Sequence, residues 1–222
     1  MTFLITAGPT REPIDPVRYI SNRSSGKMGY AIAEAALDFG HDVILISGPV
    51  NLAPPRKARF ISVLTSNEMF EAAQAHADES DICVLCAAVA DYKPAHVSPT
   101  KIKKTGDGIS IDLIPTRDIL QSLGRRQNRK FLLAGFAAET DHLEANAIKK
   151  LREKNCDIIV ANDARIALES DENELLILFR DGEAKTIFRA PKKILARELV
   201  KIFLKFTTKM FDKKDVMITE RT

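Results

Sequence analysis

Three segments near the amino terminus decide the fold: TFLITA at Thr2–Ala7, KMGYAIAEAALDF at Lys27–Phe39 and DVILIS at Asp42–Ser47. The first and third are short apolar runs, which is typical of buried strands. The second has apolar residues at helical spacing and is followed by Gly40, a helix-terminating residue. A strand, a helix and a strand in this order predict two parallel strands of one sheet.

The same alternation continues through most of the chain. Further strands are predicted at Phe60–Leu64, Asp81–Val89, Phe131–Phe136 and Asp157–Val160, and helices at Asn67–Ala77, Asp141–Lys154 and Lys192–Phe206. This order predicts an α/β, Rossmann-like three-layer fold with a mostly parallel central sheet. Two apolar runs, Glu174–Arg180 and Ala184–Arg189, flank an Asp-Gly-Glu turn and predict a C-terminal β-hairpin.

The 222 residues are predicted to form a single α/β domain, because no flexible linker divides them. Residues 92–115 interrupt the alternation with a polar stretch containing Lys101-Ile102-Lys103-Lys104. Long loops of this kind are often functional, so the stretch is either a mobile flap or a solvated charge run. After Thr207 the chain is highly charged, and we expect a frayed tail over about residues 208–222.

The composition, with 45% hydrophobic and 28% charged residues and no tryptophan, is that of a globular protein with an aliphatic core. Three cysteines without a disulfide framework favour a reducing compartment. Neither a secretory signal nor an apolar run of membrane-spanning length is visible in the sequence. We therefore expect a cytoplasmic protein without a membrane partner.

The net charge of +3 is unevenly distributed, because the residues from Arg180 onward contain 12 Lys and Arg against 6 Asp and Glu. A basic segment can bind nucleic acid or a membrane surface. Helical spacing favours instead the solvated face of one helix, formed by Lys192, Lys193, Arg197, Lys201 and Lys205. We expect no nucleic-acid partner.

Ligands of open α/β sheets bind beyond the carboxyl ends of the strands. This rule selects five segments of the chain: Gly8–Gly29, Ser47–Pro49, Ala87–Asp91, Ala137–Thr140 and Ala161–Asp163. Only Ser47–Pro49 lacks polar groups suited to a ligand.

The sequence Ser24-Ser25-Gly26-Lys27 precedes the first predicted helix, where small residues let a phosphate approach the backbone. It is not a Walker A loop, because Ser21 stands where that motif needs glycine and Met28 where it needs Ser or Thr. Nor does it follow the GxGxxG pattern. The residues alone leave phosphate binding and a plain helix cap open.

Residues that could carry covalent or redox chemistry are scarce. Cys83 and Cys86 lie in a fully apolar run and face opposite sides of a strand, which favours buried packing over a metal or redox site. The four histidines form no ligand-like pair, and no Gly-x-Ser-x-Gly motif is present. The chemistry predicted is therefore positioning and charge neutralisation, as in nucleotidyl transfer.

Five ordered motifs resemble phosphopantothenoylcysteine synthetase, also called phosphopantothenate–cysteine ligase, of the bacterial CTP-dependent type. They are ITAGPTREPIDPVRYISNRSSGKMG, AAVADYKP, KIKK, GFAAET and KNCDIIVAND, and the resemblance extends over about residues 2–205. The family's domain often follows a flavin-dependent decarboxylase domain. This chain begins directly at the synthetase strand, so a free-standing domain with a possible separate phosphopantothenoylcysteine decarboxylase partner is expected.

The resemblance implies a reaction in two steps. The carboxylate of 4′-phosphopantothenate attacks the α-phosphate of CTP, giving an acyl cytidylate and pyrophosphate. The amine of L-cysteine then displaces CMP and forms the amide of 4′-phosphopantothenoylcysteine in coenzyme A biosynthesis. Mg²⁺ or Mn²⁺ would be held mainly by the nucleotide phosphates, and the family is homodimeric with residues 92–115 near the interface.

The resemblance also implies residue roles. The catalytic residues would be Asn22, which contacts the acyl phosphate, and Lys101, a flap lysine that neutralises charge on the nucleotide, whereas Arg18 reaches the substrate phosphate of the neighbouring subunit. Other nucleotide-binding positions would be Ser24, Ser25, Gly26, Cys86, Ala87, Asp91, Arg117, Asp118, Ile119, Leu120, Phe136, Lys150 and Lys154. Substrate contacts would also come from Ala87, Ala88 and Asp91.

Two parts of the chain depart from the family pattern. Thr116-Arg117 stands where the family often has Asn-Pro, and Ala167-Leu168-Glu169 where a Gly-Phe is usual. Two alternatives to a ligase remain. An NAD(P)-dependent oxidoreductase predicts a GxGxxG turn and an acid after the second strand, where the chain has Ser47–Pro49. A non-catalytic nucleotide-binding module does not explain a lysine flap beside Asn22 and Asp91.

Overall fold

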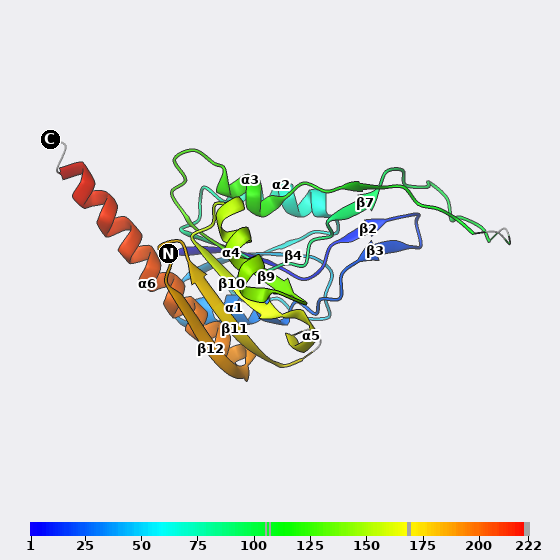
Figure 1. Cartoon of the computed structure of the whole chain (residues 1–222). Helices are drawn as coiled ribbons and strands as arrows, with labels where there is room; N and C mark the ends of the chain where they lie inside the picture. The colour runs from blue at the N-terminus through cyan, green and yellow to red at the C-terminus, as the bar shows by residue number, and fades with distance from the viewer. Residues whose placement is uncertain (105, 107, 168–169, 220–222) are drawn as a thin grey trace.

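The computed structural model describes residues 1–104, 106, 108–167 and 170–219. Its centre is an eight-stranded sheet with the order β12-β11-β10-β9-β6-β1-β4-β5. The strands from β10 to β5 in this order are parallel, whereas β11 and β12 are antiparallel to their neighbours. The prediction of an α/β fold with a mostly parallel sheet and a C-terminal β-hairpin is confirmed (Figure 1).

The elements have the following bounds. The central strands are β1 (Thr2–Ala7), β4 (Asp42–Ser47), β5 (Arg59–Ser62), β6 (Ile82–Leu85), β9 (Leu132–Glu139), β10 (Ile158–Asp163), β11 (Glu172–Phe179) and β12 (Ala184–Pro191). The helices are α1 (Lys27–Asp38), α2 (Ser66–His76), α3 (Ile119–Gly124), α4 (Leu143–Glu153), α5 (Ala164–Ala167) and α6 (Lys192–Thr219). Two small antiparallel sheets pair β2 (Arg11–Pro13) with β3 (Tyr19–Ser21) and β7 (Tyr92–Pro94) with β8 (Leu113–Pro115).

The helices cover both faces of the central sheet and make three layers. One core cluster joins the sheet to α1 and α6 and contains Ile32 and Phe203, and the other joins it to α2, α3 and α4 and contains Met69. Cys83 belongs to the second cluster and Cys86 packs against the first. The two cysteines therefore face opposite sides of the sheet, as the strand periodicity predicts.

Several strand ends differ from those predicted. β6 ends at Leu85, so Cys86 already lies beyond the strand end, whereas β9 and β10 continue to Glu139 and Asp163. The segments Ala137–Thr140 and Ala161–Asp163 were expected beyond the strand ends but lie largely within strands. The reason is that the parallel ladder between β9 and β10 continues to the pair Glu139 and Asp163, and the small Ala137 and Ala161 are still buried in the core.

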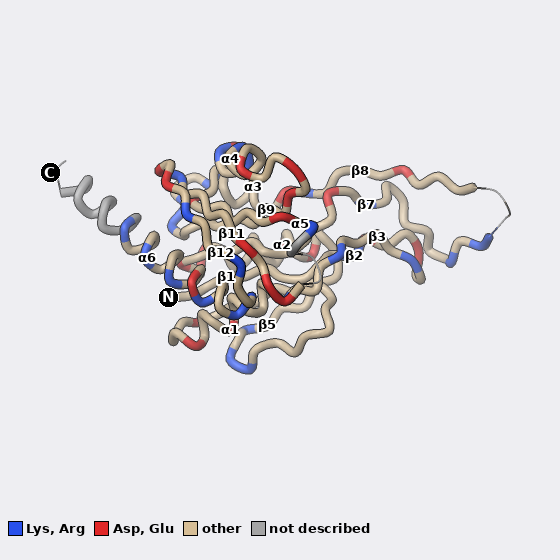
Figure 2. Tube along the Cα trace, turned by 60° about the horizontal axis from the view of Figure 1, so that its bottom comes forward, with Lys and Arg blue, Asp and Glu red and all other residues tan. Residues whose placement is uncertain are grey.

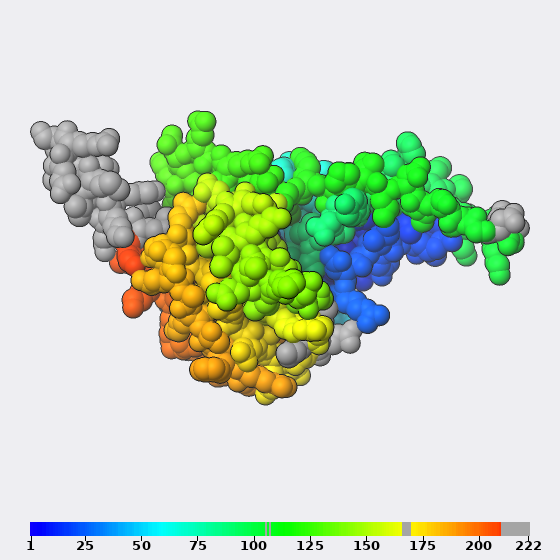
Figure 3. Space-filling model, in the orientation of Figure 1, coloured from blue at the N-terminus to red at the C-terminus, as the bar shows by residue number. Residues whose placement is uncertain are grey.

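An arm projects from the body of the molecule and is built from the two small sheets (Figures 1 and 3). The sequence predicted only loops here. Short strands with mostly exposed side chains have no apolar alternation that would identify them. Instead, pairing is set by contacts between distant segments, such as the N–H of Ser98 donating to the carbonyl of Ile14 at 3.0 Å.

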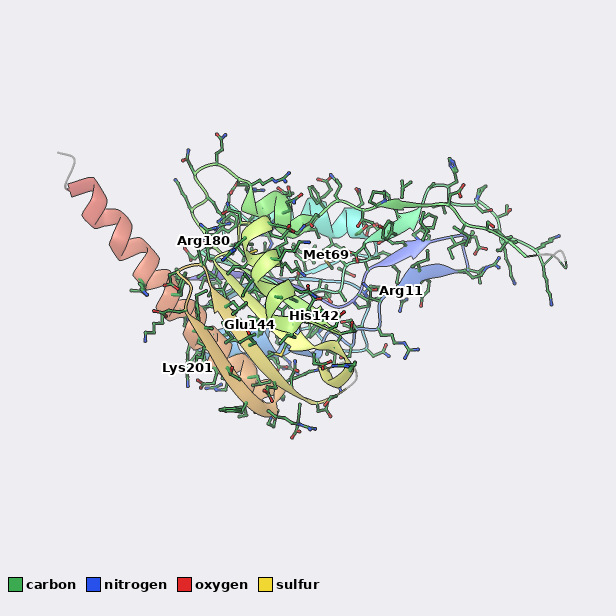
Figure 4. The ribbon with its side chains drawn as sticks, in the orientation of Figure 1. Arg11, Met69, His142, Glu144, Arg180 and Lys201 are labelled. Atoms are coloured by element: carbon green, nitrogen blue, oxygen red, sulfur yellow. The ribbon has the colours of Figure 1, made fainter. Side chains whose placement is uncertain are left out.

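The last helix differs from its prediction in two ways. α6 continues to Thr219, beyond the predicted end at Phe206, and residues 220–222 lie outside the described residues. Lys201 is exposed on α6 (Figure 4), as expected for a solvated face, and basic residues recur along the described part of this helix (Figure 2). Lys192, which was expected on the same face, is instead only 8% exposed. Among the helices of the described chain, none has the length and apolarity needed to span a bilayer.

Gly48 offers a test of how the first loop is held against the sheet. A Cβ at Gly48 would lie 1.7 Å from the carbonyl oxygen of Pro9. We expect Gly48→Ala to lower the free energy of unfolding by about 1–3 kcal/mol, because neither backbone can move without breaking strand pairing. Urea denaturation at fixed protein concentration measures this. Gly108→Ala, where no atom lies within 4 Å of the added carbon, is the matched control; equal effects of both changes would refute the steric argument.

Candidate active site

Two neighbouring cavities lie at the carboxyl edge of the parallel strands. The first cavity has a volume of about 440 Å³ and the second about 220 Å³. The first cavity is lined by Asn22, Arg23, Ser24, Ser25, Gly26, Lys27, Met28, Gly29, Cys86, Ala87, Ala88, Val89, Asp91, Phe136, Ala138, Lys150, Asn162, Ala164, Asn173 and Lys192. The second is lined by Thr6, Leu85, Ala87, Val89, Asp91, Thr116, Arg117, Asp118, Ile119, Leu120, Phe136, Lys150 and Lys154.

The wall between the cavities is common to both. Its shared residues are Ala87, Val89, Asp91, Phe136 and Lys150. They come from the segment after β6, from β9 and from α4, which the parallel topology brings to one edge. Of the site residues expected from the sequence, only Arg18 and Lys101 line neither cavity.

The loop before α1 supplies one side of the first cavity. Gly26 is the residue before the helix and has φ +73°, a left-handed conformation that disfavours side chains, and no side chain caps the helix there. The hydroxyl of Ser24 accepts a hydrogen bond from the Gly26 N–H at 3.3 Å. The sequence left open whether this segment binds phosphate or only caps the helix. Small residues and the absence of a side-chain cap at Gly26 favour the binding of an anion.

Asn22 joins the first loop to the segment after β6. Its side-chain amide donates to the carbonyls of Val89 at 3.0 Å and Ala88 at 3.3 Å. The N–H of Ala88 in turn donates to the carbonyl of Gly8 at 2.9 Å. Asn22 is therefore fixed beside the shared wall, where its amide can reach a group that lies between the cavities.

The second cavity is formed around the start of α3. Asp118 caps this helix by accepting from the Gln121 N–H at 2.7 Å, and it pairs with Lys154 at 2.8 Å. The guanidinium of Arg117 is directed to α2, where it pairs with Glu71 at 2.6 Å and lies 3.8 Å from the Phe70 ring centroid. Arg117, which departs from the family pattern, thus contacts α2 and not the cavity interior. The backbone of this turn therefore remains to face a ligand.

The Cys86 thiol is protonated at neutral pH, because burial raises its pKa to about 12. Burial also raises the pKa of the Cys83 thiol. Neither cysteine therefore provides a thiolate for nucleophilic or metal chemistry. Across the described residues, His, Cys, Asp and Glu form no group of three that could hold a metal ion. Asp91 is the carboxylate that lines both cavities, and one carboxylate together with nucleotide phosphates is a common way of holding Mg²⁺.

Arg18 and Lys101 belong to the arm, where Asp15 ties their segments together. The buried Asp15 carboxylate accepts from the Arg18 side chain at 2.5 Å and from the N–H of Ile102 at 3.1 Å. The Arg18 guanidinium also donates to the Ile102 carbonyl at 2.5 Å. Although burial acts to raise the Asp15 pKa, hydrogen bonds from Val17, Arg18 and Ile102 lower it well below its usual range. The carboxylate is therefore ionised at neutral pH.

The sequence assigned no individual role to several residues of the first cavity: Lys27, Asn162, Asn173 and Lys192. Lys27 and Asn162 lie within segments that the strand-end rule selects, whereas Lys192 was expected on a solvated helix face. Burial lowers the pKa of Lys192, and Lys27 lowers it further, whereas Asp171 and Cys86 raise it. Residues 168–169, which belong to a departure from the family pattern near this edge, lie outside the described residues.

The fold and the position of the cavities define an open α/β protein of the Rossmann-like class, with its ligand site at the strand ends. A family model described as the DNA/pantothenate metabolism flavoprotein C-terminal domain matches residues 1–206. The chain belongs to this family, which confirms at the level of the family the resemblance drawn from the motifs.

Curated relatives agree with this assignment. The chain is 48% identical over 198 residues to the coenzyme A biosynthesis bifunctional protein CoaBC of Haemophilus influenzae, covering 88% of this chain and 49% of that protein. It is 43% identical over 206 residues to CoaBC of Escherichia coli K12, covering 90% and 50%. The chain thus spans about half the length of these relatives.

Solved structures show the same fold. A crystal structure of the C-terminal domain of CoaBC has a TM-score of 0.80 and 44% identity, covering 95% of this chain and 96% of that one. The DNA/pantothenate metabolism flavoprotein from Streptococcus pneumoniae also has a TM-score of 0.80, at 23% identity, with coverage of 93% and 99%. The latter likeness concerns the fold alone.

The contacts of Asp15 predict that it holds the flap segment to the β2–β3 turn. Asp15→Asn should increase deuterium uptake at pH 7 in the peptide that contains Ile102, because a neutral amide cannot accept both the arginine and the backbone bonds as strongly. Asp112→Asn, at an exposed carboxylate of the same arm, is the control.

The pKa of Asp15 is lower in the folded state than in the unfolded state, where an aspartate has a pKa of about 3.9. The contribution of Asp15 to stability is therefore fully present at a pH above the unfolded-state pKa, and it is lost as the pH falls toward the folded-state pKa. In the wild type, protection of Ile102 should therefore persist between pH 5 and 8 after correction for intrinsic exchange. Loss of protection within this range, or unchanged uptake in Asp15→Asn, would contradict the assignment.

Proposed function

We propose that this chain is a phosphopantothenate–cysteine ligase that uses CTP and forms 4′-phosphopantothenoylcysteine in coenzyme A biosynthesis. The observation that supports it most directly is the position of Asn22 beside the wall shared by the two cavities. A nucleotide can place its base in the second cavity and its phosphates in the first, with the reacting α-phosphate between them.

The chain's own residues suit the first step, in which the carboxylate of phosphopantothenate attacks the α-phosphorus and pyrophosphate leaves. Ser24, Ser25 and Gly26 offer backbone and hydroxyl groups to phosphate oxygens at the start of α1. Lys150 lines both cavities, and its amine donates to the Phe136 carbonyl at 3.0 Å. Mg²⁺ or Mn²⁺ bound to the phosphates would supply further charge neutralisation, and Asp91, which lines both cavities, is the candidate carboxylate.

The second step needs no enzyme nucleophile. The amine of L-cysteine attacks the acyl carbon, loses a proton and displaces CMP. The Asn22 amide can donate to the oxyanion that develops on this carbon or on its phosphate, without competing for the proton of the amine. Protonated Cys86 is a lining residue in this scheme.

The arm is proposed to form a homodimer. Large apolar side chains that are 38–58% exposed gather on it: Val17, Tyr19, Tyr92, Val97, Ile109, Ile111, Leu113 and Ile114. Exposed apolar patches of this kind mark protein interfaces. At the base of the arm, Arg11 (Figure 4) stacks over Tyr19 with 4.6 Å between the guanidinium carbon and the ring centroid.

Arg18 and Lys101 line neither cavity of their own chain. Dimerisation would explain how they can still contact the ligands. We propose that Arg18 contacts the substrate phosphate in the neighbouring subunit and that Lys101 reaches the nucleotide during activation. The relatives are bifunctional coenzyme A biosynthesis proteins, which supports a phosphopantothenoylcysteine decarboxylase as the partner that uses the product.

The proposed activity is tested by incubating the protein with 4′-phosphopantothenate, L-cysteine, Mg²⁺ and one nucleotide at a time. Mass spectrometry should detect the amide product and CMP with CTP, and no product with NADPH. Formation of product with ATP but not with CTP would overturn the nucleotide assignment. Absence of product with every nucleotide, from protein that is folded by circular dichroism, would overturn the ligase.

Asn22→Asp should release pyrophosphate but accumulate the acyl cytidylate, because a carboxylate repels the acyl phosphate and cannot donate to the oxyanion. We expect amide formation to fall roughly 100- to 1000-fold, the usual effect of removing one oxyanion donor. Quenched-flow mass spectrometry of the intermediate and product measures the two steps separately. Asn128→Asp makes the same change at an exposed position and serves as the control. Normal product yield from Asn22→Asp would remove Asn22 from the second step.

A further inference from the structure

The first cavity has a lysine end, formed by Lys27 and Lys192, that the ligase scheme does not use, and neither lysine lines the second cavity. Lys192 is the first residue of α6 and is 8% exposed, and Lys27 is the first residue of α1. Lys27 pairs with the carboxylate of Asp171 at 2.5 Å, and the N–H of Lys192 donates to the Asp171 carbonyl at 2.9 Å. Two cations therefore lie together beside the small residues of the first loop.

The lining of the two cavities shows how a bound nucleotide would be oriented relative to the lysine end. The segment from Arg117 to Leu120 lines the second cavity and not the first, whereas Ser24–Lys27 and Lys192 line the first and not the second. The shared wall and Asn22 lie between them. This step rests on the proposed function: with the base in the second cavity and the α-phosphate at Asn22, the β- and γ-phosphates extend toward the lysines.

The positive charges of Lys27 and Lys192 are opposite to the negative charge of pyrophosphate, the leaving group of the first step. When the carboxylate oxygen bonds to the α-phosphorus, the bond from that phosphorus to the bridging oxygen breaks, and the electron pair leaves with pyrophosphate. Positive charges fixed where this negative charge develops lower the barrier, and they act more strongly away from bulk water. Lys192 is in such a place, because burial lowers its pKa and an arriving anion would favour its charged form.

We propose that Lys192 and Lys27 hold the β- and γ-phosphates of the nucleotide and the pyrophosphate that departs. Asp171, whose side chain is 82% exposed, acts as a removable counter-ion: it holds Lys27 before the phosphates arrive and releases it to them. The amino acid substrate is a weaker match to this end, because it offers a single carboxylate to two lysines and a helix start.

The test measures binding of Mg²⁺-pyrophosphate, CTP and CMP by calorimetry to the full chain. Lys192→Met keeps an unbranched side chain that is shorter by one atom and removes its charge. It should weaken binding of pyrophosphate and CTP roughly ten- to a hundredfold, the effect of losing one charged hydrogen bond, and leave CMP unchanged. Lys193→Met is the matched control, because Lys193 is the next residue, is exposed and forms a long ion pair with Glu34 at 3.9 Å.

Two further variants keep the test decisive if Lys192→Met folds poorly. Lys27→Met, at a side chain that is 40% exposed, should also weaken pyrophosphate and CTP but not CMP. Asp171→Asn should tighten pyrophosphate about two- to fivefold, because Lys27 no longer exchanges an ion pair for the phosphate. A purely structural role of the cluster predicts instead that every substitution weakens CTP and CMP equally.

Three results would overturn the proposal: equal losses for CTP and CMP, unchanged pyrophosphate affinity in both lysine variants, or a raised KM for L-cysteine with unchanged nucleotide binding. The last would assign the lysines to the amino acid carboxylate. These outcomes differ from failure of the proposed function, which is absence of amide product in the wild type. Pyrophosphate binding by wild type and Lys192→Met reports on the lysine end whether or not the ligase reaction is found.

Discussion

The parallel pairing of β1 with both β4 and β6 is the constraint on which the rest of the structure depends. Phe3, Leu4 and Ile5 are fully buried, so β1 offers no place for a polar ligand along its length. Chemistry becomes possible only where the strands end. Parallel strands end at the same edge, and this brings the first loop beside the segment that follows β6.

The parts of the fold that were predictable are those whose residues are buried by the sheet itself. Thr2–Ala7 and Asp42–Ser47 are apolar runs bounded by turn residues, and the observed strands have the predicted bounds. The arm was not predictable in the same way, since β2, β3, β7 and β8 have three residues each. Their pairing depends on contacts between distant segments, such as those of Asp15 with Ile102, and no local pattern reports such contacts.

The residues expected at the site from the resemblance do meet in space, with Arg18 and Lys101 the exceptions. Lys192 shows what helical spacing alone leaves out. Periodicity treats every lysine on a helix face as equivalent, yet side chains of a helix point toward its amino terminus. The first residue therefore extends past the helix start toward the sheet edge. Pro191, which cannot lie inside a helix, was the signal in the sequence that Lys192 begins one.

The first cavity is also where folding and ligand binding are coupled. Lys27, Lys150 and Lys192 reach it from three different helices, and Asp91 is the acidic residue of its lining. Bringing an ammonium group out of water costs several kcal/mol unless another charge compensates it. A polyanion that enters the cavity adds to the compensation that Asp171 gives Lys27, so it stabilises the packing of α1 and α6 against the sheet by mass action. The lysines that would bind the phosphates thus couple binding of the nucleotide to the packing of the starts of α1 and α6 against the sheet.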